Sequence, residues 1–146
     1  MAIQSDGRIV VAGMVIPGTE VGDVLTARYL PDGRLDSGFG HHGMALGDFT
    51  NLDRGFGVAL GPGGTIVVAG ACTERDDYFQ DFAVVRYRAD GKADSTFGRG
   101  GRVITDYGRD DLATSVAIQF DGKIVVAGSG STSSGRGGFA LARYLG

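Results

Sequence analysis

The fold is decided by residues 117–128, which read AIQFDGKIVVAG. Two apolar runs flank Asp121 and Gly122, and a short Asp-Gly turn between apolar runs is typical of a β-hairpin, because glycine accepts a positive φ. The second run, Ile-Val-Val-Ala, is apolar without alternation, as in a strand that is covered on both faces. We therefore expect a hairpin in a sheet that has other layers packed on both sides.

The same stretch occurs three times in the chain. Residues 2–13 read AIQSDGRIVVAG and residues 59–70 read ALGPGGTIVVAG, so the copies begin at Ala2, Ala59 and Ala117, at a nearly constant interval. A second block also has three copies, LTARYL at 25–30, AVVRYR at 83–88 and ALARYL at 140–145. A third block has two copies, DGRLDSGFG at 32–40 and DGKADSTFG at 90–98. A fixed long period of this kind predicts a stack of like structural units.

The residue pattern of each repeat unit predicts four short strands. They are the two hairpin strands at 115–119 and 123–127, a third strand at 139–145, and a fourth represented by 101–106 of the preceding unit. No stretch shows a helical stripe closed by caps, so we expect no helix. Four antiparallel strands that are apolar on both faces describe a β-propeller blade, whereas the coils of a β-solenoid are usually shorter.

We therefore predict an all-β protein built from β-propeller blades of up to four antiparallel strands. The chain forms one repeat domain, with repeats at about 1–55, 56–112 and 113–146, the last of them truncated.

These repeated blocks resemble the delta-60 repeat of bacterial, often secreted, β-propeller-like proteins. The resemblance covers essentially the whole chain and departs from the pattern at residues 61–64, GPGG, where the hairpin turn loses its Asp. It implies an architecture but no activity, because the family carries no defined catalytic residues.

Composition excludes several functional classes. Glycine accounts for 27 of the 146 residues, too many for an ordinary helical domain, and we expect these glycines in turns. A net charge of -3 gives no broad positive field for nucleic acid or anionic lipid, and no apolar run approaches a membrane span. The N-terminal residues lack the features of a signal peptide, which leaves the location open. The single cysteine, Cys72, cannot form an intrachain disulfide and is expected to be inert.

The repeat is incomplete, because the hairpin occurs three times and the fourth strand twice. Closed propellers usually contain four to eight blades. Unpaired apolar blade faces are assembly sites, so we expect the chain to associate with itself, most simply as a homodimer that forms a ring of six units. A fragment of a longer ring is the alternative.

Residues shared by the repeats are expected to serve folding. The clearest are three arginines, each followed by Tyr: Arg28, Arg86 and Arg143. We predict that these arginines are buried and paired with the recurrent Asp36 and Asp94 or with Asp48 and Asp106. A ring of anion sites is the alternative for these arginines. Asp6 and Asp121 are predicted to be turn residues.

The two histidines, His41 and His42, occur in one repeat only, in a Gly-rich loop. Together with Asp48 they are candidate ligands for a divalent metal. Adjacent histidines on an extended segment point to opposite sides, so one chain offers at most a weak site. A Ser37, His41 and Asp36 triad has no supporting motif.

The connections between second and third strands vary most between repeats, at 14–22, 71–80 and 129–138. Variable loops on a repeated scaffold commonly form its binding face. In the second of them, four residues are candidates to bind a cation or sugar hydroxyls: Glu74, Asp76, Asp77 and Tyr78.

Two functions are consistent with these features. The first is a self-assembling scaffold or binding module without catalysis, with a protein or carbohydrate ligand. The alternative is a metal-assisted hydrolase of esters, lactones or phosphoesters. Its site would lie near the ring axis and combine His41 and His42 with acidic residues of several chains such as Asp23, Asp48 or Asp81.

Overall fold

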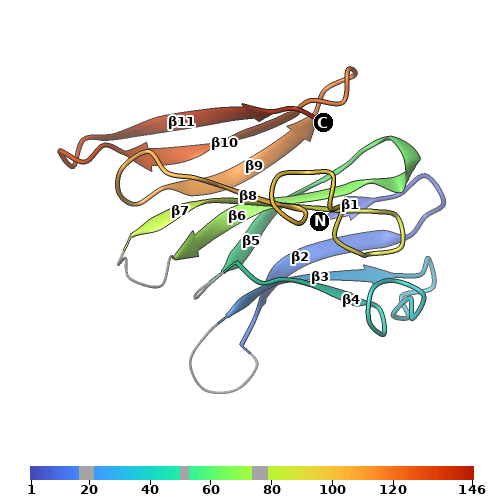
Figure 1. The fold of residues 1–146 in the computed structure, drawn as a ribbon. Helices are drawn as coiled ribbons and strands as arrows, with labels where there is room; N and C mark the ends of the chain where they lie inside the picture. Colours follow the sequence, from blue (N-terminus) through green and yellow to red (C-terminus); the bar gives the residue numbers. More distant parts are fainter. Residues whose placement is uncertain (17–21, 50–52, 74–78) are drawn as a thin grey trace.

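The structure is a computed structural model that describes residues 1–16, 22–49, 53–73 and 79–146 of the chain. These residues form three antiparallel sheets that are stacked face to face (Figure 1). The first sheet contains β1 (Ala2–Ile3), β2 (Ile9–Val15), β3 (Asp23–Tyr29) and β4 (Met44–Gly47). The second contains β5 (Arg54–Leu60), β6 (Ile66–Thr73), β7 (Gln80–Tyr87) and β8 (Arg102–Thr105), and the third β9 (Leu112–Ile118), β10 (Ile124–Ser131) and β11 (Gly137–Tyr144). The described residues contain no α-helix, which confirms the all-β prediction.

Within each sheet, strands that follow one another in the chain are neighbours. The predicted hairpin is formed by β9 and β10, with Ala117 opposite Val125. In its turn Gly122 has a φ of 83°, and the carboxylate of Asp121 accepts the backbone N–H of Lys123 at 3.2 Å. The second repeat, which lacks the turn Asp, uses a 3-10 turn at Pro62–Gly64 (η1) and still pairs β5 with β6.

The glycine that ends the IVVAG motif has a specific role in the second and third sheets. Both sheets have a β-bulge between their first and second strands. A Cβ on Gly70 would stand 1.7 Å from the carbonyl oxygen of Arg54, and a Cβ on Gly128 would stand 1.8 Å from that of Leu112. Only glycine allows this approach of two backbones. At the equivalent Gly13 a Cβ would meet nothing within 4 Å, since β1 pairs only with the first two residues of β2.

The sheets are joined through two apolar cores. We call the face of a sheet that points to the following sheet its forward face, and the face that points to the preceding sheet its rear face. The first core joins the forward face of the first sheet to the rear face of the second, and includes Val10, Val24 and Phe39 against Ile66, Val68, Val85 and Tyr87. The second joins the second sheet to the third in the same way, with Val67, Ala69, Phe82, Val84 and Phe97 against Ile124, Val126 and Ala140.

The first strands of the sheets lie at the edge where the stack converges. β5 packs against β9 and against β2, whereas β4 and β8, at the other edge, have no comparable contact with a neighbouring sheet among the described residues. The sheets therefore diverge from their first strands toward their fourth strands, as blades do around a propeller axis.

Candidate functional site

The recurrent arginines of the first two sheets are held on the forward faces by ion pairs. Nε of Arg28 lies 2.8 Å from Oδ2 of Asp36, and Nε of Arg86 lies 2.9 Å from Oδ2 of Asp94. The four side chains are between 10% and 18% exposed. Each guanidinium also covers the phenylalanine ring of its own repeat, with Cζ at 4.7 and 4.8 Å from the ring centroid. The pairs therefore fasten the segment after the third strand to the sheet.

The third repeat lacks this pair. Arg143 is exposed and has no ion pair with any described residue, because no third copy of the DGxxD block supplies the aspartate. Asp48 and Asp106, the other partners considered for the arginines, do not pair with them either. Asp106 instead accepts the backbone N–H of Gly108. The expectation of a buried, paired arginine thus needs correction for Arg143.

The ion-paired carboxyls are more acidic than usual. Thr96 donates its hydroxyl to Asp94 at 2.8 Å and its backbone N–H at 3.1 Å, and these bonds, with the arginine, lower the pKa of Asp94 despite partial burial. At Asp36 burial is the largest influence and acts to raise the pKa. The Gly38 N–H and the arginine outweigh it, so that the pKa of Asp36 is also lowered.

The two histidines lie in a tight turn rather than in an extended segment. His42 has a φ of 53°, in the left-handed region, and its ring centroid lies 4.2 Å from that of His41 with the rings at 75°. The expectation that the two side chains point to opposite sides is therefore wrong. Neither histidine belongs to a group of three potential metal ligands in the described part of the chain, so His41, His42 and Asp48 do not form a metal site within one chain.

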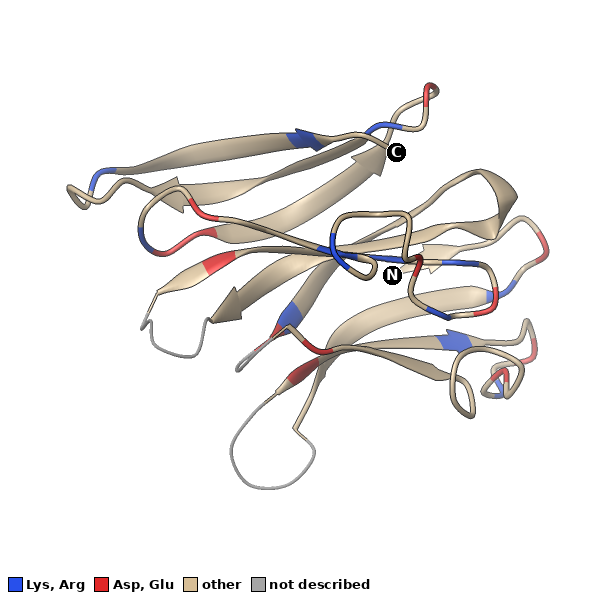
Figure 2. Ribbon diagram, viewed as in Figure 1, with Lys and Arg blue, Asp and Glu red and all other residues tan. Residues whose placement is uncertain are grey.

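The structure instead brings aspartates together in two groups of three. In each group, one oxygen from every carboxylate lies within 4.8 Å of the others, and each member of the second group is the repeat counterpart of a member of the first. The groups are Asp23, Asp48 and Asp53, and Asp81, Asp106 and Asp111. Both lie at one end of the stack, where Figure 2 shows acidic residues on neighbouring ribbons. We call this end the acidic edge.

Two members of these groups hold the linkers between the sheets. Asp53 and Asp111 are fully buried. Each accepts the backbone N–H of the residue four positions earlier, at 2.7 and 2.6 Å. Each also donates its own backbone N–H to a carbonyl at the start of the third strand of the preceding sheet, at 2.6 and 2.7 Å. Sequence reasoning did not single out these two residues, although their equivalent places in successive repeats were a usable signal.

Antiparallel sheets that recur at a nearly constant interval along the chain and pack forward face to rear face are arranged as consecutive propeller blades. The family described as a domain of unknown function (DUF5122) beta-propeller matches residues 4–39, 62–97 and 119–145. The chain belongs to this β-propeller family. No curated protein matches the chain.

The three sheets of this DUF5122 domain are therefore blades, and the resemblance of its repeats to a propeller-like repeat family is confirmed. The matched segments contain the hairpin turns of all three repeats and the paired arginines Arg28 and Arg86. Among the described residues, no helix has the length and apolar character needed to span a bilayer.

The acidic edge of the DUF5122 domain has the donor atoms of a hard-cation site, since carboxylate oxygens suit Ca²⁺ and Mg²⁺. At Asp111, however, one oxygen accepts the N–H of Tyr107 at 2.6 Å and the other accepts that of Ser131 at 2.8 Å. Burial and the charge of Asp48 raise the pKa of Asp23. In the second group, both oxygens of the buried Asp111 are therefore already taken by backbone N–H groups.

Other candidate residues have structural surroundings or cannot be placed. The oxygens of Asp36 accept hydrogen bonds from Gly38 and Arg28, which leaves this carboxylate in a structural role rather than orienting His41. Cys72 is fully buried in β6. The predicted loop ligands lie outside the described residues: Glu74, Asp76, Asp77 and Tyr78.

The lowered pKa values of Asp36 and Asp94 predict that the stability of the fold depends on pH. A carboxyl whose pKa is lower in the folded than in the unfolded chain stabilises the fold above its unfolded pKa, near 3.8, and this contribution is lost as the pH falls through the folded pKa. We expect the melting temperature to fall on acidification from about pH 5 to about pH 2. Circular dichroism should show a smaller fall for the D36N/D94N variant, and an equal fall would contradict the assignment to these carboxyls.

Proposed function

We propose that this β-propeller domain is a non-catalytic scaffold that presents its variable loops to a binding partner. The observation that carries the proposal is that the recurrent buried charged residues of the domain hold its own segments in place. The paired Arg28 and Arg86 hold the segment after the third strand, and Asp53 and Asp111 hold the linkers between blades. These charged groups recur from blade to blade and bind the backbone or one another. This recurrence supports a structural role rather than a catalytic one.

The arrangement of the strands supports a binding role for the loops. The second strand of every blade, β2, β6 and β10, ends at the same side of the stack (Figure 1). The connections that vary most between repeats therefore start beside one another, next to the acidic edge. Carboxylates at this end favour a partner that offers basic groups or hydroxyls, which a protein or a carbohydrate supplies.

The alternative, a metal-assisted hydrolase, gains no support from the described residues. It requires His41 and His42 to share a site with carboxylates of several chains, such as Asp23, Asp48 or Asp81. The histidines lie outside both carboxylate groups. The residues available for catalysis in this reading are thus separated within one chain.

A hydrolysis assay with metal analysis tests the proposal. We expect purified protein to hydrolyse p-nitrophenyl acetate and p-nitrophenyl phosphate no faster than the H41A/H42A variant, with or without EDTA. This variant is a matched control because both histidines lie in an exposed turn and leave the blade cores intact. A rate that EDTA removes and that the variant lacks, together with a metal that co-purifies, would contradict the proposal.

A further inference from the structure

The forward face of the third blade is apolar and exposed. Phe139 and Leu141 on β11 are 83% and 53% exposed. Their repeat counterparts in the second blade, Phe82 and Val84, are fully buried against the third blade. Phe139 and Leu141 are two residues apart on β11 and therefore share one face, whereas Ala140 between them points to the opposite face and packs in the core with the second blade. The third blade therefore repeats a surface that is covered in the second.

The rear face of the first blade is the complementary surface. Ile3 on β1 and Leu46 on β4 are 65% and 54% exposed. The register places Ile3 opposite Ile9 and Leu46 opposite Leu25, all on the face away from the second blade. The counterpart of Ile3 in the second blade is Leu60, which packs in the core between the first two blades.

We propose that the forward face of the third blade packs on the rear face of the first blade of a second copy of the chain. The proposal rests on the scaffold function above and names its partner. A forward face packed on a rear face already forms both junctions within the chain, and the contact between copies would continue that packing. A contact between two different faces is heterologous, and two such contacts close a ring of two copies if the rotation fits. Two copies give six blades, within the range of four to eight found in closed propellers.

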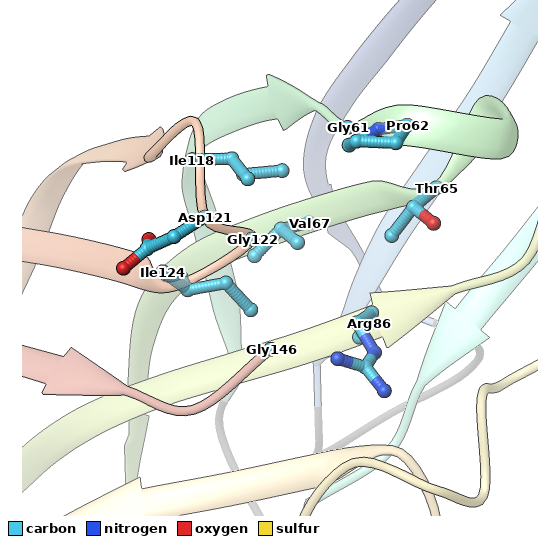
Figure 3. A pocket seen from close by; sticks show the side chains of 10 residues that line it. All are labelled: Gly61, Pro62, Thr65, Val67, Arg86, Ile118, Asp121, Gly122, Ile124 and Gly146. Carbon is cyan, nitrogen blue, oxygen red and sulfur yellow. The ribbon is translucent and has the colours of Figure 1, made fainter.

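The exposed Arg143 fits this junction. At the first junction Nη1 of Arg28 donates to the carbonyl of Ala89 in the second blade, at 2.7 Å. At the second junction Arg86 points into a cavity of about 200 Å³ that is also lined by Gly146, the repeat counterpart of Ala89 (Figure 3). The corresponding residue of the first blade is Pro31. In the assembly, Arg143 donates to the carbonyl of Pro31 in the second copy.

Two double variants test the junction from its two sides. F139D/L141D places charge on the forward face and I3D/L46D places charge on the rear face. Since all four side chains are already exposed, the melting temperature measured at a concentration where the wild type is monomeric should hardly change. Size exclusion with light scattering at micromolar concentration should give wild type at twice the 15.1 kDa of one chain and each double variant at 15.1 kDa. F120D, on a fully exposed phenylalanine in the β9–β10 turn, is the matched control and should keep the wild-type mass.

Mixing the two double variants distinguishes this junction from other dimers. Each variant retains the face that the other has lost, so an equimolar mixture should recover a species of twice 15.1 kDa that neither variant forms alone. A monomeric wild type, a dimer that survives both double variants, or a mixture that stays monomeric would overturn the proposal. None of these results bears on catalysis, whereas EDTA-sensitive hydrolysis would overturn the scaffold function whatever the mass.

Discussion

Replacing Gly70 with alanine is expected to destabilise the chain by more than about 4 kcal/mol, enough to unfold a domain of ordinary stability. The added Cβ would stand 1.7 Å from the carbonyl oxygen of Arg54, a backbone atom that cannot move without breaking the bulged pairing of β5 and β6. Urea unfolding followed by circular dichroism measures the loss. The variant should be largely unfolded in buffer or unfold at a much lower urea concentration.

The repeat supplies a matched control for this substitution. Gly13 holds the same place in the first repeat, but a Cβ there would meet nothing within 4 Å. Gly13→Ala should therefore leave the free energy of unfolding within about 1 kcal/mol of wild type. Equal effects at Gly13 and Gly70 would show that the bulge does not explain the recurrent glycine.

Replacing Asp94 with asparagine is expected to cost about 3 kcal/mol, because it leaves the guanidinium of Arg86 buried without its anion. The side chains of Asp94 and Arg86 are 18% and 10% exposed, so water replaces little of the lost interaction. The free energy of unfolding from urea titration at neutral pH measures the effect. The Phe97 ring beneath the guanidinium should still lie between the second and third blades.

An exposed ion pair of the preceding repeat serves as the control. Arg34 and Asp32 approach within 2.8 Å, but their side chains are 79% and 51% exposed. Asp32→Asn should change stability little, since solvent screens such pairs. If D94N and D32N behaved alike, the Arg86 pair would not be the structural tie described here.

Much of the fold was predictable because the determinants are local in sequence and are repeated. The Asp-Gly turn at 121–122 and the apolar IVVA run specify a covered hairpin, and three copies of them specify stacked blades. The Arg-Tyr block and the following DGxxD block also lie close together in sequence. Their pairing within a repeat, Arg28 with Asp36 and Arg86 with Asp94, was therefore among the possibilities that the spacing allowed.

The remaining features of the fold and of the candidate site depend on contacts in three dimensions that the spacing of residues along the sequence does not specify. Asp48 was a candidate both for an arginine and for the histidines, but it joins Asp53 of the same linker and Asp23 at the start of β3, which is distant in sequence. The left-handed φ of His42 turns the two imidazoles toward each other, and no residue pattern indicated it. The strand nearest the axis was likewise open, because a tight hairpin makes two strands adjacent without saying which lies inside.

The most direct test of the assembly is the molar mass of the unmodified chain by sedimentation equilibrium across the micromolar range. Head-to-tail packing of third blade on first blade predicts a mass that approaches twice 15.1 kDa as concentration rises. A mass that remains at 15.1 kDa throughout would contradict it, because the exposed faces carrying Phe139 and Ile3 would then have no copy of the chain to cover them.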